Sequence, residues 1–291
     1  MAKRYPYWFL LPASLVFAVL YIAPTLAGFY FSMTDWSIYN YEHVRFIGFK
    51  HFQTLIHSFS SSDFYNALKN TFIFASGATV LQNVIGFALA LLMNEPLRGR
   101  NVYRAVFFLP FIMSSLVIGY VFSAILHPSG ILNEWLALIG LEGLARDWLG
   151  DGKSGIYAIT AVHIWHTAGF IMVIHLAGLQ NISKEMLEAA QIDGSRYFRS
   201  LRSIIIPLMA PSLIVSILLS IIGSLKVFEI VYVMTGGGPG KATQVVNIFI
   251  WQQFADGDFG LGAAAGILLF LVISLIAFII LPLLKRREVE L

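Results

Sequence analysis

Glu188-Ala189-Ala190-Gln191-Ile192-Asp193-Gly194, continued by Ile204-Ile205-Ile206-Pro207, is the only long polar segment of this apolar chain that is placed to face the cytoplasm. The segment predicts two short helices that are separated at Gly194. Ser183 is suited to cap the first helix, and Glu185 puts a negative charge in its first turn, where the helix dipole favours one. Ala189, Ala190 and Gly194 leave one side nearly bare, so another protein surface can approach it closely.

The second predicted helix has a clear apolar face. Ser195 is suited to cap it, and an apolar stripe follows at helical spacing, made of Tyr197, Leu201, Ile204 and Ile205. Three arginines lie away from that stripe: Arg196, Arg199 and Arg202. We interpret them as topology determinants that contact lipid headgroups.

This segment resembles a loop found in permease subunits of binding-protein-dependent ABC importers. That loop has the form EAA, three residues, G, nine residues, I, one residue, LP. Six positions here are in register with it: Glu188, Ala189, Ala190, Gly194, Ile204 and Pro207. Ile206 stands where Leu is usual, an apolar exchange. The flanking stretches 178–182, 228–232 and 235–239 resemble the carbohydrate branch of the family, of the maltose and glycerol-phosphate type.

The resemblance implies a type I ABC importer permease in a bacterial or archaeal plasma (inner) membrane. It implies that segment 183–206, with Glu188 and Asp193, docks on an ATPase. The implied partners are a second homologous permease subunit, two ABC ATPase subunits and an extracytoplasmic solute-binding protein that delivers a sugar. ATP and Mg would be bound by the ATPase subunits, so no cofactor is expected in this chain.

Composition alone predicts an all-α polytopic membrane protein. Of the 291 residues 58% are hydrophobic and only 12% are charged, whereas soluble chains are nearer a quarter charged. Apolar runs of about twenty residues recur, which suits helices that cross a bilayer. The net charge of +3 comes from basic residues at helix ends, which argues against nucleic-acid binding. The chain has no cysteine and therefore no disulfide framework.

The apolar runs predict six transmembrane helices in a single permease domain over residues 1–291, at 7–33, 67–93, 104–126, 156–179, 207–234 and 261–284. The first run is longer than the ~7–15-residue core of a signal peptide, so we expect a retained helix. Three segments are expected to be loops outside the cell: 34–66, 127–155 and 235–260. Pro207 suits the first turn of the fifth helix.

The basic residues set the predicted orientation. Twelve lie on the side of the polar segment: Lys3, Arg4, Arg98, Arg100, Arg104, Lys184, Arg196, Arg199, Arg202, Lys285, Arg286 and Arg287. Five lie on the other side: Arg45, Lys50, Arg146, Lys153 and Lys241. Both termini and the polar segment are therefore expected in the cytoplasm.

Two ionisable residues fall in the fifth predicted helix. Lys226 and Glu229 are three apart, close enough to pair, near the outer edge of the hydrocarbon. One interpretation is a structural ion pair, and the other is contact with the substrate or a role in gating.

Small polar residues recur on two predicted helices. Ser216, Ser220 and Ser224 follow one another every fourth residue. They suit close helix packing, or they line a sugar path, and positions equivalent to Ser220 and Ser224 contact sugar in the maltose-type relatives. Three residues of the second helix are expected to form hydrogen bonds between helices: Asn70, Gln82 and Asn83.

The fourth predicted helix carries aromatic and imidazole side chains. His163, His166 and Phe170 share a face, but two histidines without a third ligand do not predict a metal site. Matching to the family by distance from the polar segment points to His166, Thr167 and Phe170 as sugar contacts, although the residue types differ. Ordinary packing of the helix is the alternative.

No catalytic residue is predicted. The loop from Thr235 to Ala242 lacks the first glycine and the Ser or Thr of a phosphate-binding loop, and no strand precedes it. We therefore expect ATP hydrolysis in separate subunits. The alternative class is a stand-alone secondary transporter or channel for a small polar solute. It would need carboxylates near the bilayer centre, and Glu229 lies near one end.

Overall fold

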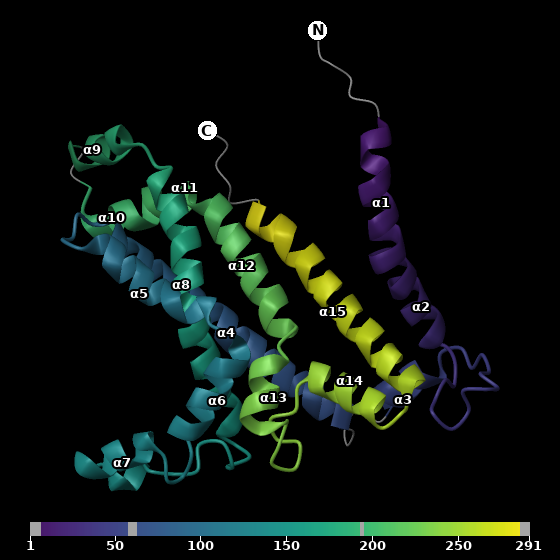
Figure 1. Ribbon diagram of the computed structural model, residues 1–291. Helices are drawn as coiled ribbons and strands as arrows, with labels where there is room; N and C mark the ends of the chain where they lie inside the picture. Colours follow the sequence, from purple (N-terminus) through teal and green to yellow (C-terminus); the bar gives the residue numbers. More distant parts are fainter. Residues whose placement is uncertain (1–6, 58–62, 193–194, 286–291) are drawn as a thin grey trace. The chain divides into compact units, whose positions relative to one another are not determined.

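The computed structural model describes residues 7–57, 63–192 and 195–285, and its regular elements are all helices (Figure 1). Within these residues, four helices are long and apolar enough to cross a membrane, and the number rises to six if each of two bent pairs of helices counts as one span. The predicted all-α membrane fold is confirmed. Asp193 and Gly194 of the polar segment, and the basic residues Lys3, Arg4, Arg286 and Arg287, lie outside the described residues.

The chain divides into two compact units, residues 1–65 with 249–272, and residues 66–248 with 273–291. The first unit begins with one nearly continuous helical rod: η1 (Tyr7–Leu10), α1 (Leu11–Phe17), the π-helical η2 (Ala18–Ile22) and α2 (Ala23–Phe31). It also contains α3 (Lys50–His57), most of α14 (Val246–Ala255) and the first half of α15 (Phe259–Lys285).

Contacts between aromatic rings and backbone hydrogen bonds hold the first unit together. The Trp36 ring lies 4.3 Å from the ring of Phe31 and 4.8 Å from that of Phe259. The Ile38 N–H donates to the Gly257 carbonyl at 2.8 Å. The segments expected to be loops at 34–66 and 235–260 contain short helices, α3 and α14.

The second unit contains the remaining helices. They are α4 (Asp63–Asn94, from Asn66 on), α5 (Arg100–Ile112), α6 (Ser115–Ile125), α7 (Ile131–Leu138), η3 (Glu142–Leu144), α8 (Gly155–Gln180), α9 (Lys184–Ile192), α10 (Tyr197–Ser200), the π-helical η4 (Leu201–Ile205), α11 (Ile206–Leu208), α12 (Ala210–Leu225) and α13 (Glu229–Thr235). The second half of α15 also belongs to it.

Two of the predicted spans are not single helices. The expected helix 104–126 is α5 and α6, which meet at 93°. Pro110 removes a donor from the last turn of α5, and the Ser114 hydroxyl accepts from the Leu116 N–H at 3.3 Å to begin α6. The expected helix 207–234 ends at Leu225 and resumes as α13 at Glu229. A further bend of 73° separates residues 198–208 from α12.

Helix α8 is the centre of the second unit, and glycines let its neighbours come close. A Cβ on Gly169 would collide with the Phe107 carbonyl of α5, and one on Gly178 would collide with the Ser212 side chain of α12. A Cβ on Gly86 of α4 would lie 2.7 Å from the Ile171 side chain of α8, which is also too close for an ordinary contact. Small residues at such contacts are the usual means of packing helices in lipid, where backbones must approach closely.

Candidate functional site

The polar segment forms a short helix directly beyond the end of α8. Only residues 181–183 separate α8 from α9. The Ser183 hydroxyl accepts from the Met186 N–H at 3.4 Å, so the predicted N-cap is confirmed. Glu185 lies in the first turn, as expected. A short link thus attaches α9 to α8, and the Ser183 side chain caps the start of α9.

The residues of α9 divide between an exposed side and a buried side. Glu188 and Ile192 are exposed, the latter to 86%, while Ala190 is only 8% exposed. The Ala190 carbonyl accepts from the Ser195 N–H at 2.9 Å, which turns the chain back toward α10. Glu188 is therefore presented to the surroundings, with the small Ala190 against the body of the protein.

The second half of the segment leads into α12 without a loop. The Ser195 hydroxyl accepts a hydrogen bond from the Ser200 hydroxyl at 2.9 Å. Ile204 lies in η4, and Pro207 in the first turn of α11, where its missing N–H does no harm. Met209, fully buried, marks the bend into α12. The segment is therefore connected to α8 at one end and to α12 at the other.

Beneath the segment, a cavity of about 260 Å³ reaches the end of α4. Its lining combines four polar residues, Asn94, Glu95, Ser195 and Ser200, with apolar residues that include Leu179 and Leu187. The segment also rests on a buried cluster that joins α4, α8 and Met209, made of Ala90, Met93, Met172, Leu176, Leu179 and Met209. Ile182, just before α9, and Ile205, at the end of η4, pack against this cluster.

A seam of polar side chains joins α4, α8 and α12 inside the span. The Asn83 amide donates to the Ser220 hydroxyl at 2.9 Å, and the Thr167 hydroxyl donates to the Gln82 amide oxygen at 2.6 Å. The predicted interhelical role of Gln82 and Asn83 is confirmed. The Ser224 hydroxyl is buried and has no hydrogen-bond partner among the described residues.

Asn70 of α4 forms its hydrogen bonds with a loop rather than with another helix. Its amide donates to the Ala242 carbonyl at 2.8 Å and to the Gln244 carbonyl at 3.0 Å. The adjacent Thr71 hydroxyl accepts from the Val246 N–H at 2.9 Å. These bonds fix the chain between α13 and α14 to α4.

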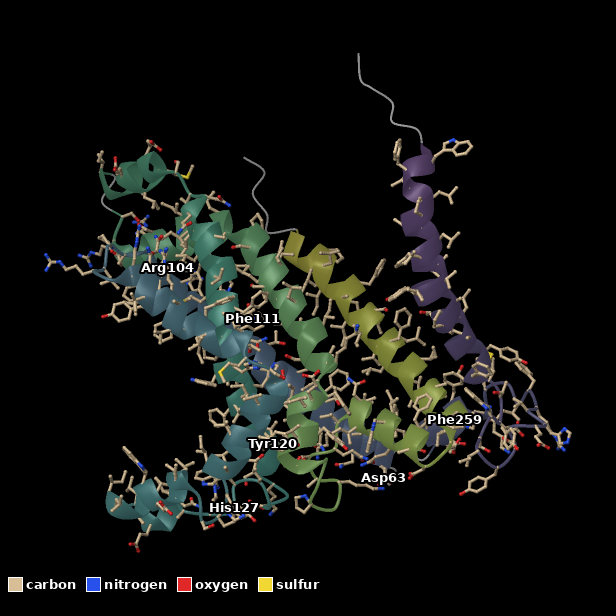
Figure 2. The ribbon with its side chains drawn as sticks, in the orientation of Figure 1. Asp63, Arg104, Phe111, Tyr120, His127 and Phe259 are labelled. Atoms are coloured by element: carbon tan, nitrogen blue, oxygen red, sulfur yellow. The ribbon has the colours of Figure 1, made fainter. Side chains whose placement is uncertain are left out.

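His166 and Phe170 face a different neighbour from Thr167. The His166 Nε2 lies 3.2 Å from the Met113 carbonyl, which the bend between α5 and α6 leaves without a helical partner. The Phe170 ring stacks on the Phe111 ring at 4.3 Å; Figure 2 labels Phe111 on α5. The three residues predicted to share a sugar contact are therefore not brought together on one surface.

The predicted pairing of Lys226 with Glu229 is wrong. Lys226 follows the last residue of α12, and Glu229 is the first residue of α13, so the two are not on one helix. Both are exposed, and no ion pair joins them, though both are among the described residues. Sequence reasoning missed Asn247, whose amide lies 3.3 Å from the Val227 carbonyl in this break.

Side chains from other elements thus form hydrogen bonds with backbone carbonyls at helix ends in the second unit. His166 contacts the Met113 carbonyl at the bend, and the Asn247 amide contacts the Val227 carbonyl at the break. The Arg104 guanidinium donates to the Met93 carbonyl at 2.7 Å near the end of α4. In a bilayer no water replaces such partners, so breaks are tolerated only where side chains satisfy them. No cluster of three or more potential metal ligands occurs in the described part of the chain.

A family model described as "Binding-protein-dependent transport system inner membrane component" matches residues 82–289. The chain belongs to this family. It is the multi-pass inner-membrane permease subunit of a binding-protein-dependent ABC importer.

Curated relatives match this permease over nearly its whole length. It is 32% identical to the "Probable starch degradation products transport system permease protein AmyD" of Thermoanaerobacterium thermosulfurigenes, covering 98% of this chain and 95% of the relative. It is 34% identical to the "Trehalose/maltose transport system permease protein MalF" of Thermococcus litoralis, covering 92% and 89%.

A solved structure matches the permease as well. It is a bacterial ABC transporter involved in the import of the acidic polysaccharide alginate, with a TM-score of 0.82, 25% identity, and 96% of this chain and 94% of that chain covered. A second crystal structure, of a bacterial alginate ABC transporter in complex with an alginate pentasaccharide-bound periplasmic protein, matches with a TM-score of 0.79.

Proposed function

We propose that residues 1–291 form one permease domain that imports a sugar or oligosaccharide. A solute-binding protein outside the cell delivers the sugar, and a second homologous permease subunit completes the pathway. Two ABC ATPase subunits hold ATP and Mg and hydrolyse the ATP. The starch, trehalose and maltose named for the relatives, and the alginate named for the solved structure, support a carbohydrate substrate.

One observation carries the proposal: the segment 183–206 is joined to both α8 and α12. The exposed Glu188 would accept hydrogen bonds from a cleft of the ATPase subunit, together with Asp193 and Gly194 of the motif. Because a helix in lipid has no alternative partners for its backbone, α8 and α12 are stiff and pass on a displacement of the segment. Closure of the ATPase dimer around ATP would thereby move both spans.

The proposed topology puts both termini and the segment in the cytoplasm. The twelve Lys and Arg residues on this side, against five on the other, support it. The loop between α13 and α14 and the helix α7 then face the outside, where the solute-binding protein docks.

We place the sugar path along α8 and α12. Thr167, Ser220 and Ser224 supply hydroxyls in the seam, and their helices would have to part for a sugar to reach them. His166 and Phe170 lie on the side of α8 that contacts Met113 and Phe111. Lys226 and Glu229 lie at the break beyond α12. Hydroxyls and aromatic rings are the groups that recognise sugars, and few of them are needed in a path.

Reconstitution tests the proposal. Proteoliposomes holding this subunit, its partner permease and the two ATPase subunits should take up a labelled maltodextrin only when ATP is inside and loaded binding protein is outside. Liposomes with this chain alone should take up nothing. Uptake by this chain alone, driven by an ion gradient, would support the stand-alone transporter instead.

A further inference from the structure

Helix α7 carries an apolar face that no part of the second unit covers. Four large side chains on one face of α7 and its C-cap are between 60% and 83% exposed: Ile131, Trp135, Leu138 and Ile139. Leu141 and Leu144, in and next to η3, add 45% and 57% exposure just beyond. A contiguous apolar face of this kind marks an interaction surface, because soluble proteins rarely leave one in water.

The opposite face of α7 is fixed to the second unit. The Asn133 amide donates to the carbonyls of Pro128, at 3.0 Å, and Arg146, at 2.9 Å. Its oxygen accepts from the Trp148 indole N–H at 2.9 Å. Leu132 and Trp148 pack on the buried cluster between α6, α8 and α13. The helix therefore has a defined orientation, and its apolar face is directed away from the protein.

The location of α7 indicates what meets this face. It follows the end of α6 within a few residues, at the end of the second unit away from α9 (Figure 1). The exposed face of α6 is itself apolar, with Val117 and Val121 each 47% exposed and Tyr120 69% exposed (Figure 2). An exposed apolar face on a helix that crosses the membrane is suited to contact lipid. Because α7 begins a few residues after α6 ends, it lies where the span meets the membrane interface.

The charges of the loop border the apolar face of α7 or lie beyond it, and the exposed Glu142 stands between Leu141 and Leu144. Asp147, Asp151 and Lys153 are exposed on the segment that returns to α8, and Glu134 borders the apolar face of α7 at its rim. The backbone N–H of Lys153 and the Ser154 side chain hold the pKa of Asp151 below its usual range, so this carboxylate is charged at neutral pH. Within α7 itself the polar residues are Asn133 and Glu134, and one aromatic residue, Trp135, lies on the apolar face. Trp is enriched at membrane interfaces, so an apolar helical face with a Trp suits a helix that lies in the interface.

We propose that α7 lies flat in the lipid headgroup region, with Ile131, Trp135, Leu138 and Ile139 among the acyl chains. The partner is the bilayer itself, and the topology proposed above makes this the outer leaflet. The inserted helix anchors the mouth of the permease, because Asn133 joins it to the loop that leads into α8. The contact with lipid does not depend on which solute is transported.

The absence of native cysteine allows a direct test. Leu138→Cys is labelled with a bimane fluorophore, and the intact transporter is placed in liposomes of phosphatidylcholine with brominated acyl chains. We expect brominated lipid to quench the label at position 138 at least about twofold more than a label at Lys153→Cys in the same loop. Aqueous iodide should show the reverse order. Ile131→Cys, on the same face, provides a second reporter if the first variant folds poorly.

Two results would overturn the proposal. One is quenching by iodide but not by brominated lipid at both positions 131 and 138, which would put the face in water. The other is protection from iodide that arises only when the solute-binding protein is added, which would make the face a docking site for that protein. Quenching by lipid that is unchanged by the binding protein supports it.

Discussion

Two membrane-spanning segments of this permease show how differently apolar residues are used in one chain. The span Trp8–Phe31 has a mean hydropathy of 2.0, and no residue of its most apolar stretch is buried inside the protein. The span Gly155–Gln180, which is α8, has a lower mean hydropathy of 1.5, yet 61% of its most apolar stretch is buried inside the protein. The more polar helix is the more buried one, because its polar groups bond to neighbouring helices rather than face lipid.

The comparison indicates that contact between helices, rather than hydropathy, decides which spans carry the machinery. Helix α8 meets α4, α5 and α12 through glycines and through the seam at Thr167. In the first span, Gly28 has no neighbouring atom within 4 Å of its Cβ position. Pairs of substitutions, one at such a contact and one at an exposed position, test this difference between the two spans.

The largest effect is expected for Gly169→Leu. The new side chain would collide with the Phe107 backbone of α5, and a backbone cannot give way as a side chain can. We expect destabilisation of about 3 kcal/mol or more, seen as a loss of folded protein in detergent unfolding assays. The control Gly28→Leu, in the open first span, should leave the stability of the chain within about 0.5 kcal/mol. Equal losses of stability from the two substitutions would contradict the difference between the two spans.

Removal of a buried ring should come next. Phe74 of α4 is fully buried in the cluster that α4, α6, α8 and α13 share, whereas Phe72 on the same helix is 41% exposed. Phe74→Ala should lower the free energy of unfolding by about 3 kcal/mol because it leaves a cavity. For Phe72→Ala we expect a change below about 1 kcal/mol. Thermal unfolding of the two variants side by side measures the difference.

A smaller loss is expected in the polar seam. Asn83→Leu deletes the hydrogen bond to Ser220, which we expect to cost about 1 kcal/mol, since such bonds between membrane helices are individually weak. Ser76→Ala is the control, because that hydroxyl is exposed and bonds only within α4, to the Ile73 carbonyl. A double-mutant cycle of Asn83→Leu with Ser220→Ala should give a coupling energy above zero. Full additivity would place the two residues out of contact.

Much of this arrangement was predictable from single residues. The apolar runs indicated the spans, Ser183 indicated the start of α9, and Pro207 indicated the first turn that leads into α12. Each of these signals is local, because a cap or a proline acts on its own turn.

The breaks in the third and fifth spans were not predictable in the same way. Pro110 and Ser114 are local signals for the bend between α5 and α6, but its stability depends on His166 from another helix. At the break after Lys226, the Val227 carbonyl is taken by Asn247, twenty residues further on. Without that partner, Lys226 and Glu229 suggest an ordinary helical pair. Which neighbours Thr167 and Phe170 face likewise depends on packing that spacing along α8 does not reveal.

The central claim is that the exposed Glu188 on α9 couples this permease to an ATPase. ATP-driven uptake in proteoliposomes tests it with Glu188→Ala and the control Glu185→Ala, an exposed carboxylate in the first turn of the same helix. We expect Glu188→Ala to lower uptake at least about tenfold, the loss of a charged hydrogen bond, with unchanged membrane insertion. Glu185→Ala should transport at nearly the normal rate. Normal uptake by Glu188→Ala, or equal losses in both variants, would contradict the account.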